Sequence, residues 1–313
     1  MQALRLTPSA GWQWVGAGWR LFRRQPFSFA ALLFFYWVLL LSASAVVGWL
    51  AQGIGALLPF VPVDLVAALG GLAVAALTPA LTVGFLQACR VADQQQQVHP
   101  VLLFAPFRAG RTTLLRLLAL GAFQVIVLVV ILFATSGTAA FRDDPGADAA
   151  PAGARADAPL RTEAGTPSGT PSAVPADARP TAAEEAAMRR EAVHRLMQGA
   201  AYVPVALLMW YAPMLVAWHR LPAGKALFFS LVAVWRNRGA FAIYGIAWLV
   251  IWFGLSIAIA AVASLLGVGN FTAMLAAPLV MLLLSCMYCS VYPTYATVFV
   301  ETGQAREDPT RAA

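Results

Sequence analysis

Hydrophobic positions form long blocks along this chain, and polar residues gather between them. The stretch between Gln25 and Val63 contains no Asp, Glu, Lys, Arg or His. A membrane-spanning helix needs roughly 20 consecutive apolar residues. Blocks of sufficient length cover about 27–49, 65–89, 117–141 and 200–218. Each of these four blocks therefore predicts one spanning helix.

The last apolar block is long enough to cross a membrane twice. Gly239 to Val300 is 62 residues (300 − 239 + 1) without a single Asp, Glu, Lys, Arg or His. We expect the break at Gly267-Val268-Gly269-Asn270, because two glycines and an asparagine favour a tight turn. The predicted fold class is an all-α, polytopic membrane helical bundle with six transmembrane helices.

Composition and charge exclude a soluble protein and indicate how the chain is oriented. Of the 313 residues, 60 % are hydrophobic and 11 % are charged, against roughly 25 % charged in soluble domains. The net charge of +7 does not predict nucleic-acid binding, because the arginines lie beside the apolar blocks. Fourteen basic residues fall on one side of the six-span arrangement, which predicts that this side and both termini are cytoplasmic. They are Arg5, Arg20, Arg23, Arg24, Arg90, Arg108, Arg111, Arg116, Arg220, Lys225, Arg236, Arg238, Arg306 and Arg311.

These spans divide the chain into five expected regions. Residues 1–25 form a cytoplasmic amphipathic segment, with Trp12, Val15, Trp19 and Phe22 at helical spacing on the membrane interface. Residues 26–141 hold spans one to three, with a cytoplasmic interfacial segment at 90–116. Residues 142–198 form a periplasmic loop followed by a helix. Residues 199–300 hold spans four to six with an interfacial segment at 222–238, and residues 301–313 are a cytoplasmic tail.

The periplasmic loop is rich in Ala and Pro and nearly lacks large apolar residues. A segment of this composition cannot bury a core, so 142–181 is predicted to be disordered. It is either a solvated spacer or a tail that binds a partner. The run Thr181-Ala-Ala-Glu184-Glu185 resembles a capping box and predicts a helix that continues into span four.

The three predicted hairpins share an order of features. Amphipathic, arginine-terminated segments precede spans one, three and five, and the second span of each hairpin carries a proline that is expected to kink it, at Pro79, Pro213 and Pro293. Either the unit is triplicated or the match is chance, since proline is common in membrane helices.

Sequence motifs for chemistry are weak. Cys286-x-x-Cys289 has redox-motif spacing, yet on a membrane helix these two residues are typical packing material. His99, His194 and His219 do not pair at metal-ligand spacing. We therefore expect no catalytic residues, no metal and no cofactor, and predict that the protein is not an enzyme.

Several spans carry polar side chains, which leaves two interpretations open. A permease-like protein could line a path for a lipid or small neutral solute with them, although no span has a charged centre. Alternatively, they hold helices together. The residues concerned are Thr78, Thr82, Gln87, Gln124, Tyr292, Thr294, Tyr295 and Thr297.

Three stretches resemble a family of uncharacterised proteobacterial inner-membrane proteins: Gly11-Trp-Gln-Trp14-Val-Gly-Ala-Gly-Trp19-Arg-Leu-Phe22-Arg-Arg-Gln-Pro26, Phe85-Leu-Gln-Ala-Cys-Arg90-Val-Ala-Asp93 and Leu103-Phe104-Ala-Pro-Phe107-Arg. The resemblance covers nearly the whole chain and departs from the family in the long outer loop. More distantly, the arrangement is similar to the membrane domain that some bacteria fuse to glycerophosphodiester phosphodiesterases. The family resemblance implies a bacterial inner-membrane location. Phosphodiesterase activity is not expected, because the sequence has no soluble phosphodiesterase domain.

Arginines at the interfacial segments are the candidate binding residues. We call Arg20, Arg23, Arg24, Arg108, Arg111, Arg236 and Arg238 the arginine collar. Each Arg near an anionic surface contributes on the order of 1 kcal/mol. The collar is therefore expected to bind anionic phospholipid headgroups, unless its arginines serve only to orient the chain. A non-enzymatic envelope or membrane-organising role follows, with a permease-like protein as the alternative; protein partners are not predicted.

The predicted topology has a direct test. A reporter fused after Arg161 should read as periplasmic and one fused after Arg311 as cytoplasmic, because an odd number of spans separates the two sites. Alkaline phosphatase and fluorescent-protein fusions measure this, and finding both reporters on one side of the membrane would overturn the six-span topology.

Overall fold

The computed structural model describes residues 4–140, 182–267 and 272–299, and every regular element in these ranges is helical. Six helical stretches in the described residues are long and apolar enough to cross a membrane. They are Pro26–Leu57, Val63–Asp93, Arg111–Ala134, Met188–His219, Arg238–Leu265 and Ala276–Val298. The all-α, six-span class predicted from the hydrophobic blocks is thereby confirmed.

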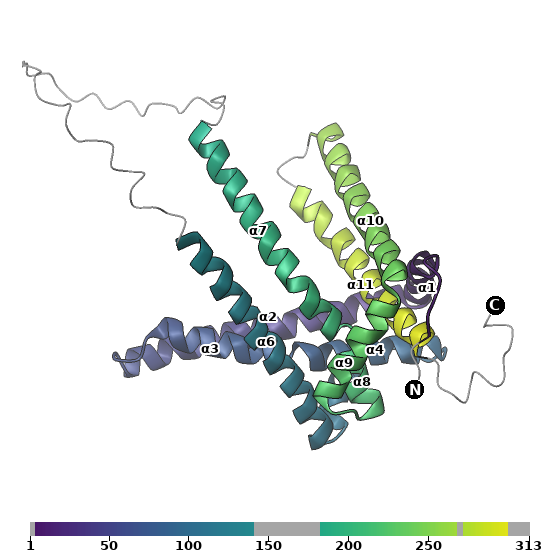
Figure 1. Ribbon diagram of the computed structural model, residues 1–313, viewed down its shortest axis with the longest axis horizontal. Coiled ribbons are helices and arrows are strands. Elements are labelled where there is room, and N and C mark those ends of the chain that lie inside the picture. The colour runs from purple at the N-terminus through teal and green to yellow at the C-terminus, as the bar shows by residue number, and fades with distance from the viewer. Residues whose placement is uncertain (1–3, 141–181, 268–271, 300–313) are drawn as a thin grey trace, which may run out of the picture. The chain divides into compact units, whose positions relative to one another are not determined.

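Helices follow the expected order of three hairpins, each preceded by a shorter interfacial element (Figure 1). The first set is α1 (Ala10–Arg24), α2 (Pro26–Leu57), α3 (Val63–Ala76) and α4 (Thr78–Asp93). The second is the 3₁₀ turn η1 (Pro100–Phe104), α5 (Ala105–Arg108), α6 (Arg111–Ala140), α7 (Ala182–Met209) and α8 (Ala212–His219). The third is α9 (Ala223–Arg236), α10 (Arg238–Leu265) and α11 (Thr272–Val298).

The chain divides into two compact units, residues 1–127 with 204–313, and residues 128–203. The second unit holds the end of α6 and most of α7, where Arg195 Nε donates to Glu191 Oε1 at 2.7 Å. Because α7 starts at Ala182 and continues to Met209, the helix expected after Thr181 does run into span four. The predicted disorder of 142–181 lies outside the described residues. At the expected break before span six, Gly267 has φ +65°, and 268–271 lie outside the described residues.

Helix α1 is packed more deeply than its amphipathic pattern predicted. It lies against α10 and α11, and Trp14, which the predicted interfacial stripe omitted, is 1 % exposed. Val15 and Phe22 of that stripe are buried as well. Trp12 and Trp19 remain 63 % and 50 % exposed. The helix therefore has two apolar faces, one within the protein and one free to contact the membrane interface.

Interfacial elements pack in a cyclic order. The η1 turn and α5, which open the second hairpin, pack on α4 of the first, and α9, which opens the third, packs on α8 of the second. Helix α1, which opens the first hairpin, packs on α11 of the third. Each interfacial element thus lies on the last helix of the preceding hairpin, and α1 closes the ring.

The predicted proline positions differ in their local structure. Pro79 and Pro213 lie in the first turns of α4 and α8, directly after helix breaks, whereas α11 runs through Pro293. At the second break, Ser230 of α9 inserts between two backbone groups that would bond each other in a continuous helix. Its hydroxyl accepts from Tyr211 N–H at 2.9 Å and donates to the Leu207 carbonyl at 3.0 Å.

Close approach between interfacial and spanning helices depends on small residues. A Cβ at Gly18 would lie 2.3 Å from the Ser290 Cβ and 2.5 Å from its Cα, so the backbone of α11 would have to move. In contrast, a Cβ at Gly16 on the same helix would meet only the flexible end of Arg20, at 3.5 Å.

We therefore predict opposite effects for two substitutions in α1. Gly18→Ala should lower the free energy of unfolding by about 1–3 kcal/mol, the usual cost of overpacking. Gly16→Ala should leave stability unchanged or raise it by up to about 1 kcal/mol, because Ala favours helix. Thermal unfolding of both variants in detergent measures the difference. Equal melting temperatures would contradict the tight contact between α1 and α11.

Candidate functional site

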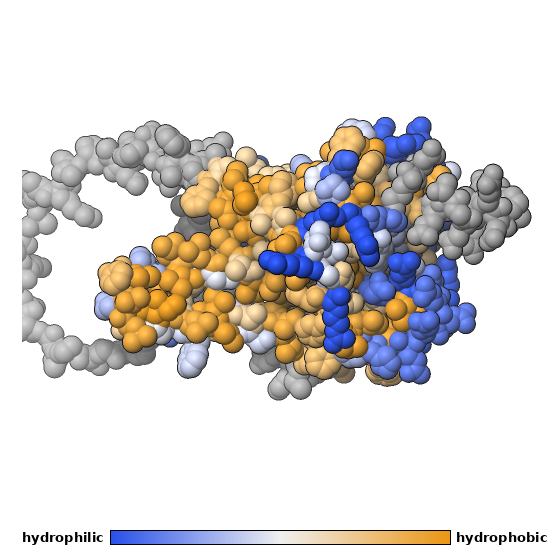
Figure 2. Space-filling view, turned by 90° about the horizontal axis from the view of Figure 1, so that it is seen from below, coloured by the Kyte–Doolittle hydropathy of each residue, from blue (hydrophilic) through white to orange (hydrophobic). Residues whose placement is uncertain are grey.

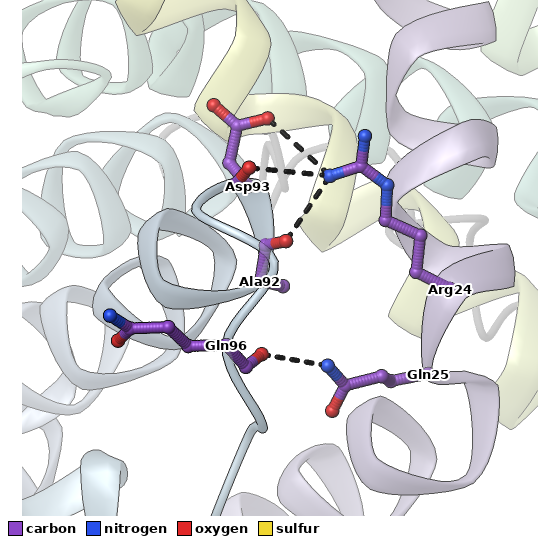
Figure 3. Close-up of polar contacts among 5 residues, drawn as sticks. All are labelled: Arg24, Gln25, Ala92, Asp93 and Gln96. Atoms are coloured by element: carbon purple, nitrogen blue, oxygen red, sulfur yellow. Dashed lines mark hydrogen bonds and ion pairs between the residues drawn. The ribbon is translucent and has the colours of Figure 1, made fainter.

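Gln25 occupies the junction between α1 and α2 and binds an extended segment of the chain. Its Nε2 donates to the Gln96 carbonyl at 2.8 Å (Figure 3), and its Oε1 accepts from Val98 N–H at 2.8 Å. The bound segment directly precedes η1. We call such a pair of bonds an amide bridge. The amide bridge provides hydrogen-bond partners for backbone N–H and carbonyl groups that lie outside a helix.

Asn237 makes the same amide bridge at the junction between α9 and α10. Its Nδ2 donates to the Leu4 carbonyl at 2.9 Å, and its Oδ1 accepts from Leu6 N–H at 2.8 Å. The bound segment directly precedes α1. Asn237 is 2 % exposed, and its Nδ2 also donates to the carbonyl of Ala233 at 2.9 Å.

A common register relates the three junctions. Gly18 and Ser230, which make the close contacts described above, each lie seven residues before the junction residue, Gln25 or Asn237. Leu103 lies seven residues before Gly110 at the start of α6, and its backbone approaches Gly84 of α4 so closely that a Cβ there would be 2.2 Å from the Leu103 carbonyl oxygen. The shared spacing supports a repeated unit.

The middle junction lacks the amide bridge. Gly110, with φ +102°, stands where the other two junctions carry Gln25 and Asn237. The segment preceding α9 is instead bound by an arginine, because Arg116 Nη1 donates to the Arg220 carbonyl. Arg220 itself adopts the left-handed conformation, with φ 54°.

All seven residues of the arginine collar are exposed. Arg24 is also anchored: its Nη1 donates to the carbonyls of Ala92 and Asp93 at 3.2 and 3.4 Å and lies 3.8 Å from the Asp93 carboxylate (Figure 3). The Arg238 guanidinium lies over the Trp235 ring, 5.9 Å from its centroid. Figure 2 shows hydrophilic residues gathered toward one end of the visible face, beside a mostly hydrophobic surface.

The collar residues follow the junctions of the fold. Arg20, Arg23 and Arg24 belong to the end of α1, Arg108 ends α5, Arg111 starts α6, Arg236 ends α9 and Arg238 starts α10. The structure therefore places all seven within a few residues of the three junctions. Charge alone identified these residues; the amides of Gln25 and Asn237, which hold the junctions together, carried no charge signal and were missed.

Polar side chains suggested for a transport path make hydrogen bonds between helices. Trp218 Nε1 donates to Gln87 Oε1 at 3.0 Å, and Trp14 Nε1 donates to Thr297 Oγ1 at 2.8 Å. Two further contacts join the same region. They are Trp210 Nε1 to Thr294 Oγ1 at 3.4 Å and His219 Nε2 to the Tyr295 hydroxyl at 2.5 Å.

The cysteines lie together in the core. Cys89 of α4 and Cys286 and Cys289 of α11 are all buried free thiols, and Cys289 is within hydrogen-bonding contact of Cys89. Among the described residues, no three His, Cys, Asp or Glu side chains are grouped so as to hold a metal ion. Cys289 of the Cys286-x-x-Cys289 motif thus lies where α11 packs on α4.

The chain is similar to a protein of Burkholderia thailandensis that is named a probable inner membrane protein. The two are 32 % identical over 301 residues, which cover 96 % of this chain and 94 % of the relative. No protein-family model and no solved structure matches the chain. The relative's name and the six apolar helices agree on a multi-pass inner-membrane protein. The distant likeness to a phosphodiesterase-fused membrane domain stays a prediction.

Removing one amide bridge should release the segment that it binds. In Asn237→Leu, the Leu4 carbonyl and Leu6 N–H lose their partner, which costs about 1–3 kcal/mol for each group left unsatisfied. We expect faster trypsin cleavage at Arg5, which lies between them. Gln25→Leu is the matched control, because it releases 96–98 and should leave cleavage at Arg5 unchanged. Equal rates for wild type and Asn237→Leu would refute the bridge.

Proposed function

Because the chain belongs to the family of the Burkholderia thailandensis inner membrane protein, we propose that it is a non-enzymatic, membrane-organising protein that binds anionic phospholipid through its arginine collar. Both termini and the collar face the cytoplasm in this proposal, since the basic residues favour that side. The observation that carries the proposal is the repetition of exposed arginines at all three junctions.

Exposed aromatic residues beside the collar support contact with the membrane interface. Trp19, Phe228 and Trp235 are each at least half exposed on the interfacial helices, and Trp side chains favour the headgroup level of a bilayer. An amphipathic helix with such a face and neighbouring arginines lies in the interface plane. The collar arginines would then bind the negatively charged lipid headgroups, while the aromatic side chains keep the interfacial helices at headgroup level.

Hydrogen bonding within the spans favours this role over the permease-like alternative. Gln87, Thr294 and Thr297, three of the polar residues considered for a solute path, are engaged by tryptophans from other parts of the chain. Groups used in this way stabilise helix packing.

The proposal predicts lipid retention that depends on collar charge. Substituting Arg20, Arg23, Arg236 and Arg238 by Gln removes four contributions of about 1 kcal/mol each, so retention of phosphatidylglycerol should fall by roughly two to three orders of magnitude if they add. Arg24 is left intact because it also anchors the chain. Native mass spectrometry of the purified protein measures the bound lipid.

Two controls make the result specific. The same four residues changed to Lys should keep most of the lipid, because the charge is retained. Arg189→Gln with Arg190→Gln, on the part of α7 predicted to be periplasmic, should have no effect. If the Gln variant retains as much lipid as wild type while its topology is unchanged, the collar only orients the chain and the proposed function is wrong.

A further inference from the structure

The three cysteines of this chain lie together between the first and third hairpins. Cys89 belongs to α4, and Cys286 and Cys289 belong to α11. Cys89 and Cys289 are each 0 % exposed and lie within hydrogen-bonding contact of one another. An isolated buried cysteine is chemically inert, whereas two thiols in contact each have the partner that a disulfide needs.

The contact between these two thiols is held from both sides along the interface of α4 and α11. One turn before Cys89, Phe85 packs against Tyr288, with ring centroids 5.3 Å apart. One turn after Cys89, Asp93 lies within hydrogen-bonding contact of Tyr292. Residues four apart share one face of a helix, so Phe85, Cys89 and Asp93 all face α11. The two thiols are therefore kept opposite one another.

Burial determines which reagents can reach the pair. The two cysteines belong to the stretches Val63–Asp93 and Ala276–Val298, which are long and apolar enough to cross a membrane. Side chains that are 0 % exposed in such stretches are shielded from charged, water-soluble reagents. A lipid-soluble molecule can reach them when α4 and α11 separate transiently. A disulfide formed here is likewise protected from soluble thiols, because exchange requires direct attack on a sulfur atom.

A covalent bond at this place would join the first hairpin to the third. Ser290, the residue after Cys289, is the one that Gly18 of α1 approaches closely. Helix α11 therefore meets α1 and α4 at neighbouring residues. Because most of the chain lies between Cys89 and Cys289, linking them also restricts the conformations of the unfolded state.

We propose that Cys89 and Cys289 form a redox-active dithiol that a lipid-soluble quinone oxidises to an interhelical disulfide. In this step the two S–H bonds break and one S–S bond forms. The two electrons and two protons pass to the quinone, which leaves as the quinol. Oxidation thus locks α4 to α11, whereas the reduced protein has the contact without the bond. This inference does not depend on the arginine collar.

Counting free thiols tests the proposal. The reduced, full-length protein in detergent is treated with a lipid-soluble quinone such as decylubiquinone, denatured, and labelled with a polyethylene-glycol maleimide, which shifts its gel mobility once for each thiol. Wild type should fall from three labels to one, and reduction after denaturation should restore all three. Cys286→Ser is the matched control and should fall from two labels to none. Cys89→Ser and Cys289→Ser should each keep both labels.

Thermal unfolding shows whether the bond locks the fold. Quinone treatment should raise the melting temperature of wild type and of Cys286→Ser and leave that of Cys89→Ser unchanged. The proposal is overturned if wild type keeps three labels after quinone treatment. It is also overturned if Cys286→Ser keeps both labels or Cys89→Ser loses both, because the bond would then involve Cys286. A bond that forms without a rise in melting temperature would refute the lock.

Discussion

Hydrogen bonding of extended backbone at the junctions is the constraint on which the rest of this structure depends. Where an interfacial helix meets a span, the neighbouring chain has left one helix and not yet entered the next, so its N–H and carbonyl groups need other partners. Gln25 and Asn237 each satisfy one carbonyl and one N–H of such a segment. Each bound segment leads into an interfacial element, so each amide links one junction to the chain that precedes another interfacial element.

The cyclic packing follows from that placement. Gly18, Leu103 and Ser230 lie at one register before their junctions, and each contacts the second span of the preceding hairpin, with the third hairpin taken as preceding α1. The contacts use different chemistry: a glycine against Ser290, a backbone against Gly84, and a hydroxyl inserted at a helix break. The spacing to the junction is thus shared by the three units although the contacting groups differ. The middle unit diverges most, because its interfacial element is short and its junction is a glycine.

Sequence patterns predicted the spans well because lipid imposes one strong rule, namely a long apolar helix for each crossing. The break near Gly267 and the helix that continues into span four were also predictable, because local turn and capping residues indicate them. Burial of Trp14 was not predictable, because a helix face that contacts lipid and one that contacts protein carry the same apolar residue types. The roles of Gln25 and Asn237 depend on residues far away in the sequence, for example Asn237 with Leu6, and no local pattern encodes such pairs. The collar arginines were identifiable by charge, but their arrangement around three equivalent junctions was not.

The ring is closed by the two ends of the described chain, since Leu4 N–H donates to the carbonyl of Val298 at 3.0 Å and Asn237 holds the same segment. Synthesis on the ribosome proceeds from the N-terminus, so α1 is made long before α10 and α11 exist. Until the last hairpin is inserted, the face of α1 that carries Trp14 has only the membrane surface to cover it. Assembly of the bundle is thus coupled to completion of the polypeptide, because a product truncated before α11 leaves the buried face of α1 without the helix on which it packs.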